Sequence, residues 1–388
     1  MPTNVKRNTA SMITRALVAN RFSLFLFFLG LVLLSCERKI EHETIPEVII
    51  EADSMPKFDA SSAAQIDDYF QELYAHRHFN GVALFASNDA IHTLALGYKN
   101  MESKDSLAVN DQFQLASVSK PFTSFGILLL VQKGLIQLQD PVSKYLNCTP
   151  YDNVTIEQLL THTSGIGYYA YVTDGLWGQP ECLMSNGDLL TMMECEEIPL
   201  YFEPGRAFDY CNTNYVLLAD IIEEVSGKPF QQYMKEEVFE KMGMSSSEII
   251  DAFSKNPSEY SVLGHYPNGD AKSISYLDGI VGDKGMYSSV FDLYKFYMES
   301  KKGTLLSDSL WNEAKSPRAK YSSRGFYGYG FRIQPMPQEN DTLIYHNGWW
   351  GGFRTYFWML KNNNKCAIIL TNSIRGGYLS KEEIWSLF

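Results

Sequence analysis

The amino-acid sequence predicts an α+β protein in which one β-sheet is built from both ends of the chain. Two strand-like segments lie early, and four more lie in the last third, at 81–87, 91–97, 329–333, 343–346, 354–360 and 365–371. The residues between about 116 and 275 show mostly helical patterns. Because strands must pair and bury one face, we expect the two groups of strands to share a sheet, with the helical segment inserted between them.

The first elements of the predicted domain follow each other closely. Apolar residues recur at helical spacing between Asp59 and His78, which predicts an amphipathic helix. Two apolar segments, 81–87 and 91–97, flank the short turn Asn88-Asp89 and predict a β-hairpin. The mostly apolar segment 122–133 predicts a helix that ends at Gly134.

The middle and the end of the chain carry further helix signals. Thr155-Ile-Glu-Gln158 has the pattern of a capping box at a helix start. Residues 214–225, which end before Gly227, and residues 230–242 have helical periodicity, and Ser380 precedes a short closing helix. The segment 165–186, rich in Gly, Tyr and Trp, is expected to be a long loop.

The N-terminus has the features of an export signal. Residues 1–35 combine Lys6, Arg7, Arg15 and Arg21 with the apolar run 22–34, which is shorter than the about 20 residues that a spanning helix needs. The next residues, Leu33-Leu34-Ser35-Cys36, resemble the lipobox of bacterial lipoproteins, with Cys36 as the acylated residue. The alternative is a secretory peptide cleaved elsewhere.

These features predict a location in the bacterial cell envelope, on the periplasmic or outer-membrane face. The membrane contact would be a lipid anchor at Cys36. The polar segment 36–58 contains two prolines and is expected to be a tether between the lipid and the domain 59–388.

The charge of the chain excludes one class of partner. The formal net charge is −12, and removing residues 1–35, which hold four positive charges and no negative ones, leaves about −16. A surface this acidic repels phosphate backbones, so nucleic-acid binding is not expected.

The six cysteines indicate neither a metal site nor a full set of disulfides. Five remain after Cys36, so at least one is expected to be free unless it pairs between chains. Cys182 and Cys195 are the only close pair, and a disulfide between them stays open. No pair has the spacing of a zinc site, and no nucleotide-binding fingerprint is present, so neither a metal nor a cofactor is predicted.

The segment Ala116-Ser-Val-Ser-Lys-Pro-Phe-Thr-Ser124 combines two serines with a lysine. Proline is tolerated in the first turn of a helix, so Pro121 indicates a helix start just upstream. Residues three apart in such a turn face each other, which favours a contact between Ser117 and Lys120 over one between Ser119 and Lys120. A lysine of lowered pKa can take the proton of a serine that attacks a carbonyl.

Two later segments add polar groups that suit acyl transfer. Tyr210-Cys-Asn212 stands just before a predicted helix, and His346-Asn-Gly348 ends a predicted strand. Each short pattern is weak by itself, and Tyr-x-Asn occurs six times in this tyrosine-rich chain.

Taken together and in this order, the segments resemble the serine β-lactamase-related family. The nearest branches are the class C β-lactamases, the D-alanyl-D-alanine peptidases and related esterases. The resemblance extends over about 60–388 and includes THTSGI (161–166), GDKGMYSSVFDLYKF (282–296), YGYGFRI (327–333) and AIILTN (367–372). It implies a central antiparallel sheet flanked by helices, with an α/β part at about 59–115 plus 276–388 and an inserted helical part at about 116–275.

The resemblance also implies roles for single residues. Ser117 would be the nucleophile, Lys120 its base and Tyr210 the group that passes the proton to the leaving group. Asn212 would hold a substrate amide, and His346 and Gly348 would line the cleft on a strand edge. The backbone N–H groups of Ser117 and Trp349 would stabilise the oxyanion.

One departure from the family pattern concerns the substrate. His346 stands where lactamases and carboxypeptidases commonly have a lysine, and a neutral histidine suits a substrate carboxylate less well. Arg354 could replace the missing charge if it turns inward, and the alternative is a solvated arginine. Trp349 and Trp350 either pack the sheet or narrow the pocket.

These observations predict an exported serine hydrolase that forms an acyl-enzyme on Ser117. Its substrate would be a small molecule or a peptide, namely a cell-wall or D-amino-acid peptide, or an ester. Two alternatives stay open, a penicillin-binding sensor that does not turn over and a true β-lactamase.

Overall fold

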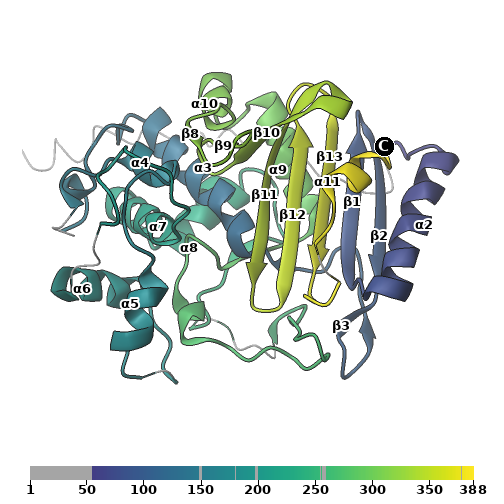
Figure 1. Ribbon diagram of the computed structural model, residues 1–388, viewed down its shortest axis with the longest axis horizontal. Coiled ribbons are helices and arrows are strands. Elements are labelled where there is room, and N and C mark those ends of the chain that lie inside the picture. The colour runs from purple at the N-terminus through teal and green to yellow at the C-terminus, as the bar shows by residue number, and fades with distance from the viewer. Residues whose placement is uncertain are drawn as a thin grey trace, which may run out of the picture. The chain divides into compact units, whose positions relative to one another are not determined.

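The largest element of the structure is an eight-stranded antiparallel sheet (Figure 1). Its strand order is β2-β1-β13-β12-β11-β10-β9-β8, so the last long strand pairs with the first one, with Gly81 opposite Thr371. The strands are β1 Gly81–Ser87, β2 Ala90–Leu96, β8 Ala319–Lys320, β9 Phe326–Tyr327, β10 Arg332–Met336, β11 Asp341–Trp350, β12 Phe353–Leu360 and β13 Lys365–Thr371. The prediction of one sheet built from both ends of the chain is confirmed.

The computed structural model describes residues 55–147, 151–179, 181–196, 200–253, 255, 259–376 and 378–388. The predicted signal peptide, Cys36 and most of the predicted tether lie outside these residues. Two small sheets complete the strand inventory of this part, with β3 Tyr98–Asn100 and β4 Asp105–Ser106 in one and β5 Phe113–Gln114, β6 Glu248–Ile249 and β7 Met286–Ser288 in the other.

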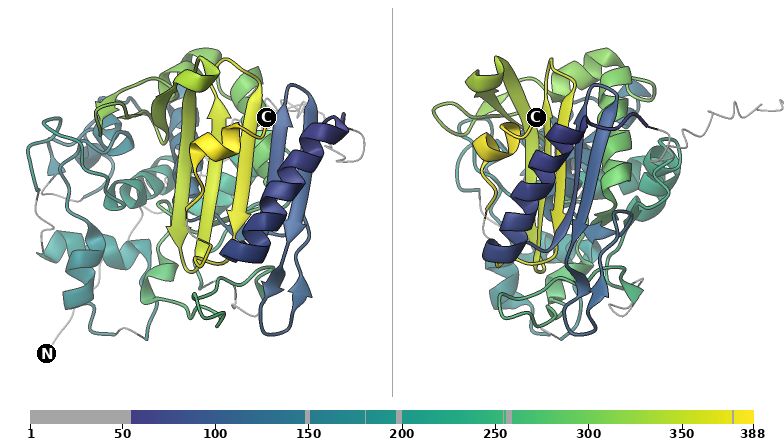
Figure 2. Two further views of the ribbon diagram at one scale, coloured as in Figure 1. Left: turned by 45° about the vertical axis from the view of Figure 1, so that its right-hand side comes forward. Right: turned by 90° about the vertical axis from the view of Figure 1, so that its right-hand side faces the viewer.

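Helices cover both faces of the large sheet. One face packs against α2 Ala60–Arg77 and α11 Lys381–Trp385, whose residues Ile66, Phe70 and Trp385 join a buried apolar cluster (Figure 2). The other face packs against a larger cluster that includes α3 Ser119–Gln132, α7 Thr213–Ser226 and α9 Val290–Lys302. The remaining helices are α4 Ile156–Leu160, α5 Tyr169–Leu176, α6 Asn186–Glu196, α8 Phe230–Met234 and α10 Asp308–Ala314.

Most predicted element starts agree with the structure. Asp59 caps α2 by accepting from the N–H groups of Ser61 and Ser62, and Thr155 forms the expected capping box at α4. No helix in the described ranges is long and apolar enough to cross a membrane. The finer division into an α/β part and a helical part stays a prediction.

Two segments differ from the sequence prediction. The expected loop 165–186 contains helix α5, because Tyr169, Ala170 and Thr173 bury one side of it. The expected helix 230–242 is α8 followed by a π-helical turn at Lys235–Phe239.

Candidate active site

Ser117 stands out at the start of α3 because it is accessible. It lies in a short 3-10 turn, Ala116–Val118, and is partly exposed, whereas residues 118–130 are buried. Ala116, directly before it, has a φ of 50°. A non-glycine residue in this left-handed region is uncommon and is often found at functional sites.

The two serines of this segment have different surroundings. Lys120 Nζ lies 3.2 Å from Ser117 Oγ, as the spacing of three residues predicted. Ser119 is 2 % exposed, and its Oγ accepts a hydrogen bond from the N–H of Met286. The structure therefore favours Ser117 over Ser119 as the reactive group.

The Lys120 side chain is fully buried and points at two carbonyl oxygens besides Ser117. Its Nζ donates to Asn212 Oδ1 at 2.8 Å and to the main-chain oxygen of Asp283 at 2.9 Å. These two acceptors hold Lys120 Nζ in place beside Ser117 Oγ.

Tyr210 lies beside this group, with the centre of its ring 5.0 Å from Lys120 Nζ. The ring of His162 packs on it at a centroid distance of 4.4 Å. His162 is fully buried, and its Nδ1 accepts a hydrogen bond from the N–H of Cys211, which fixes the segment between Tyr210 and Asn212. Burial, more than the nearby cations, holds the pKa of His162 well below its usual value, so its role is structural and neutral.

Strand β11 brings the third predicted motif to Ser117. Beyond Tyr345 its sheet partner is β12 alone, so one strand edge faces the turn that carries Ser117. A Cβ on Gly348 would lie 2.2 Å from the main-chain oxygen of Leu115. Only glycine allows β11 to approach this closely.

The structure does not bring Arg354 or the Trp349 side chain to Ser117. Gly348 pairs with Thr355, whose hydroxyl donates to Leu115 O, so this pair faces the site. The neighbouring pair, Trp349 and Arg354, therefore points to the opposite face. There Arg354 lies over the Tyr378 ring at 4.3 Å, and the Trp349 side chain is 60 % exposed. Arg354 thus does not turn toward Ser117, which was the condition for it to replace the missing charge.

His346 reaches the site as a neutral, buried side chain. Its Nδ1 donates to the main-chain oxygen of Asn347 at 2.8 Å, and its Nε2 lies 3.0 Å from the Tyr327 hydroxyl, which donates to it. Burial, followed by the charges of Arg332 and Lys120, holds the pKa of His346 well below its usual value. His346 therefore carries no charge for a substrate carboxylate.

Arg332, which the sequence analysis did not single out, supplies a cation at this place. Its guanidinium lies 5.0 Å from the ring centres of Tyr210 and Tyr321, and the side chain is partly exposed. No carboxylate within the described ranges lies at ion-pair distance from it. The signal in the sequence was an arginine inside the otherwise apolar strand segment 329–333.

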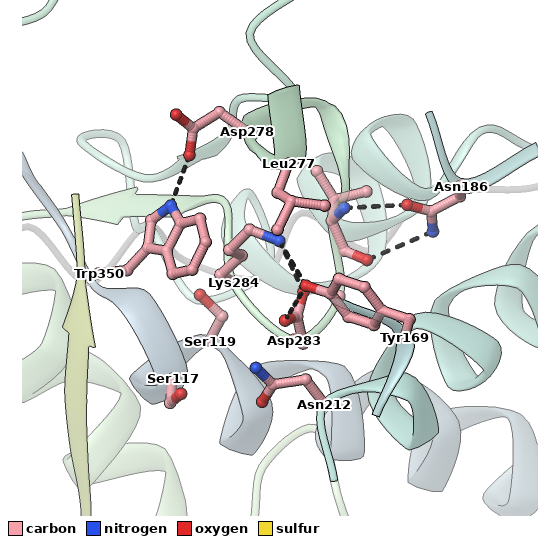
Figure 3. A network of polar contacts seen from close by, with 12 residues as sticks. Ser117, Ser119, Tyr169, Asn186, Asn212, Leu277, Asp278, Asp283, Lys284 and Trp350 are labelled. Atoms are coloured by element: carbon pink, nitrogen blue, oxygen red, sulfur yellow. Dashed lines mark hydrogen bonds and ion pairs between the residues drawn. The ribbon is translucent and has the colours of Figure 1, made fainter. Parts of the chain in front are cut away.

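A second group that sequence reasoning missed is the charged pair Asp283-Lys284 (Figure 3). Lys284 is buried, lies over the ring of Trp350 at 5.0 Å and forms an ion pair with Asp283 at 3.3 Å. Burial lowers the pKa of Lys284, and the charge of Asp283 opposes this effect. Trp350, unlike Trp349, faces the site and donates its indole N–H to Asp278.

Comparison with known proteins agrees with this fold. The Beta-lactamase family model matches residues 66–379. The chain is 33 % identical over 322 residues to penicillin-binding protein 4* of Bacillus subtilis, a match that spans 78 % of this chain and 70 % of the relative. The chain belongs to the β-lactamase family, and it is a serine hydrolase of the acyl-enzyme type.

Two solved structures have a similar fold. A penicillin-binding protein from Bacillus halodurans superposes with a TM-score of 0.72 at 27 % identity, over 82 % of this chain and 99 % of that one. The D-amino acid amidase of Ochrobactrum anthropi superposes with a TM-score of 0.68 at 20 % identity, over 80 % and 92 % of the two chains. The second likeness concerns the fold alone.

Proposed function

We propose that this protein hydrolyses D-amino-acid peptides of the cell-wall type whose leaving residue bears a free carboxylate. The observation that carries this proposal is the Arg332 guanidinium, which lies against Tyr210 and has no carboxylate partner among the described residues. A guanidinium without a partner, near the predicted proton carrier, suits a bidentate contact with a carboxylate.

The reaction would follow from the positions of three side chains. Ser117 Oγ attacks the peptide carbonyl carbon while its proton passes to Lys120 Nζ. Tyr210 delivers a proton to the leaving nitrogen, the C–N bond breaks, and an acyl ester on Ser117 remains. Water then attacks the ester, gives a proton to the same groups and regenerates the serine hydroxyl.

Asn212 supports the acyl side of the proposed substrate. Its Oδ1 is held by Lys120, and its Nδ2 lies 3.5 Å from the Tyr168 hydroxyl, so the amide orientation is fixed. An Nδ2 in this orientation can donate a second hydrogen bond to a substrate carbonyl.

The test compares a D-alanyl-D-alanine peptide with the same peptide amidated at its C-terminus. The wild-type protein is expected to prefer the free acid, and Arg332→Gln is expected to lower kcat/KM for it by about 10- to 100-fold, as for the loss of a charge-assisted hydrogen bond. The amidated peptide should lose little in the same variant.

Arg354→Gln is the matched control, since it removes an arginine of β12 that points to the face of the sheet away from Ser117. Ser117→Ala should abolish hydrolysis, whereas Ser119→Ala should retain most of it. Equal rates for the acid and the amide would contradict the proposed substrate. Labelling by a fluorescent penicillin without turnover of any peptide or ester would instead indicate a sensor.

We further propose that the protein is exported and anchored by a lipid at Cys36. The support is the sequence of residues 1–36, with its basic start, apolar run and lipobox-like end. Cys36→Ala should move the protein from the membrane fraction to the soluble fraction of fractionated cells. Retention of this variant in the membrane fraction would contradict the anchor.

A further inference from the structure

We infer that Lys284 is a positioning residue for the serine chemistry, because it clamps Asp283 so that the Asp283 main-chain carbonyl stays on Lys120. The inference rests on the proposed roles of Ser117 and Lys120 but not on the identity of the substrate. Figure 3 shows the clamp next to Ser117 and Asn212.

The clamp consists of the side chains of Tyr169, Asp283 and Lys284, which are joined to each other by hydrogen bonds and one ion pair. Lys284 Nζ donates to the Tyr169 hydroxyl at 3.0 Å and pairs with Asp283 Oδ1 at 3.3 Å. The Tyr169 hydroxyl donates to Asp283 Oδ2 at 3.0 Å. Tyr169 and Asp283 are at most 1 % exposed and Lys284 is 3 % exposed, so water contributes little to holding the Asp283 carboxylate.

The segment around Asp283 is otherwise fixed through its backbone. Side chains of α3 and α6 hold the neighbouring peptide groups: Thr123 Oγ1 donates to Gly282 O, Asn186 contacts both Val281 N and Val281 O, and Ser119 Oγ accepts from Met286 N. At Asp283 itself, the main-chain oxygen accepts a hydrogen bond from Lys120 Nζ. The Asp283 carboxylate is held by Lys284 and Tyr169. The clamp therefore sets the direction of the carbonyl that orients Lys120.

Lys284 also connects this segment with β11. Its ammonium lies over the Trp350 ring, and the Trp350 indole N–H donates to Asp278, whose side chain also accepts from the N–H of Ser275, the cap of the 3-10 turn Tyr276–Gly279. The same lysine thus contacts the end of the strand that carries Gly348. A buried ion pair adds little net stability compared with a well-packed apolar pair. Stability alone therefore does not explain why the Asp283–Lys284 pair lies beside Lys120.

The test measures acylation in a single turnover with a p-nitrophenyl ester, which needs no carboxylate. Lys284→Met keeps most of the length of the side chain but removes the ammonium group that lies over the Trp350 ring. We expect its acylation rate constant to fall by about 10- to 100-fold with an unchanged KM, as for a misplacement of a catalytic group by up to about 1 Å.

Two further variants keep the test decisive. Lys315→Met is the matched control, because Lys315, at the C-terminal end of α10, also lies over an indole ring, that of Trp311 at 5.2 Å. It should acylate at the wild-type rate. Tyr169→Phe removes one hydroxyl only and should slow acylation several-fold, with Tyr294→Phe as its control, since the buried Tyr294 hydroxyl has no partner among the described residues.

A double-mutant comparison separates positioning from a general structural role. If Lys284 acts through Lys120, Lys284→Met should have no further effect on the residual rate of Lys120→Ala. An equal loss in both backgrounds would overturn the inference, as would unchanged acylation in Lys284→Met and Tyr169→Phe. These outcomes do not depend on whether Arg332 binds a peptide carboxylate.

Discussion

The two faces of strand β11 have different roles, although the residues of the two faces alternate along one segment. His346, Gly348 and Trp350 face Ser117 and the helices, whereas Tyr345, Asn347 and Trp349 face the opposite side. On the opposite face Asn347 has a structural contact, since its Oδ1 accepts a hydrogen bond from the Trp358 indole N–H at 2.6 Å. A step of one residue therefore separates a residue of the site from a residue of the scaffold.

The largest expected effect comes from Gly348→Ala. Its Cβ would meet Leu115 O at 2.2 Å, so β11 must move away from the turn that carries Ser117. We expect kcat/KM to fall by about 100-fold or more and the free energy of unfolding to fall by about 1–3 kcal/mol. Steady-state kinetics and thermal unfolding would measure the two effects.

The matched variant on the other face is Asn347→Ala. It leaves the buried indole N–H of Trp358 without its acceptor, which costs about 1–3 kcal/mol of stability. Its kcat/KM should stay within about threefold of wild type, because the Asn347 side chain lies on the face away from Ser117 and its loss affects stability instead. Similar losses of activity in both variants would contradict the distinction between the faces.

A smaller effect is expected when the two tryptophans are compared. Trp350→Ala removes the ring that lies against the Lys284 ammonium and the indole N–H that donates to Asp278. We expect this variant to lower kcat/KM by about tenfold. Trp349→Ala removes an exposed side chain, keeps the backbone N–H, and should change stability by less than about 0.5 kcal/mol. If Trp349→Ala caused the larger loss of activity, the assigned register of β11 would be wrong.

The smallest effect is a pH dependence of stability that belongs to His346. Burial keeps its pKa low in the folded state, so below about pH 6.5 the unfolded chain binds the proton first. The contribution of His346 to stability is therefore constant above about pH 6.5 and lost as the pH falls, by at most about 1.4 kcal/mol per pH unit.

Urea unfolding of wild type and His346→Asn at pH 8, 6 and 5 would measure this slope. The difference in unfolding free energy between them should shrink as the pH falls below about 6.5. Tyr345→Phe, on the other face, should leave the slope of the wild type unchanged. A difference between wild type and His346→Asn that stays constant over this range would contradict a neutral, buried His346.

The sequence predicted what depends on local spacing. The contact of Lys120 with Ser117 follows from helix geometry, and the hairpin and the capping box at Thr155 follow from short patterns. Arg354 could replace the missing charge only if it turned inward, and the alternation of side chains along a strand places it on the other face.

Site residues that come from distant parts of the chain could not be predicted from local spacing. Arg332 reaches Tyr210 only through the position of β10 beside β11, and Lys284 meets Tyr169 only because α5 packs on the segment around Asp283. Both residues were visible as charges inside apolar segments. Their partners, however, are fixed by packing over more than a hundred residues of sequence.

The order of strands in the large sheet has a consequence for how the chain folds. β13 lies between β1 and β12, so the hairpin of β1 and β2 lacks its neighbour until residues 365–371 have been made. Contacts of such long sequence separation slow folding and leave strand edges open in partly folded chains. The large sheet therefore cannot be completed until residues 365–371 are available, which is near the end of synthesis.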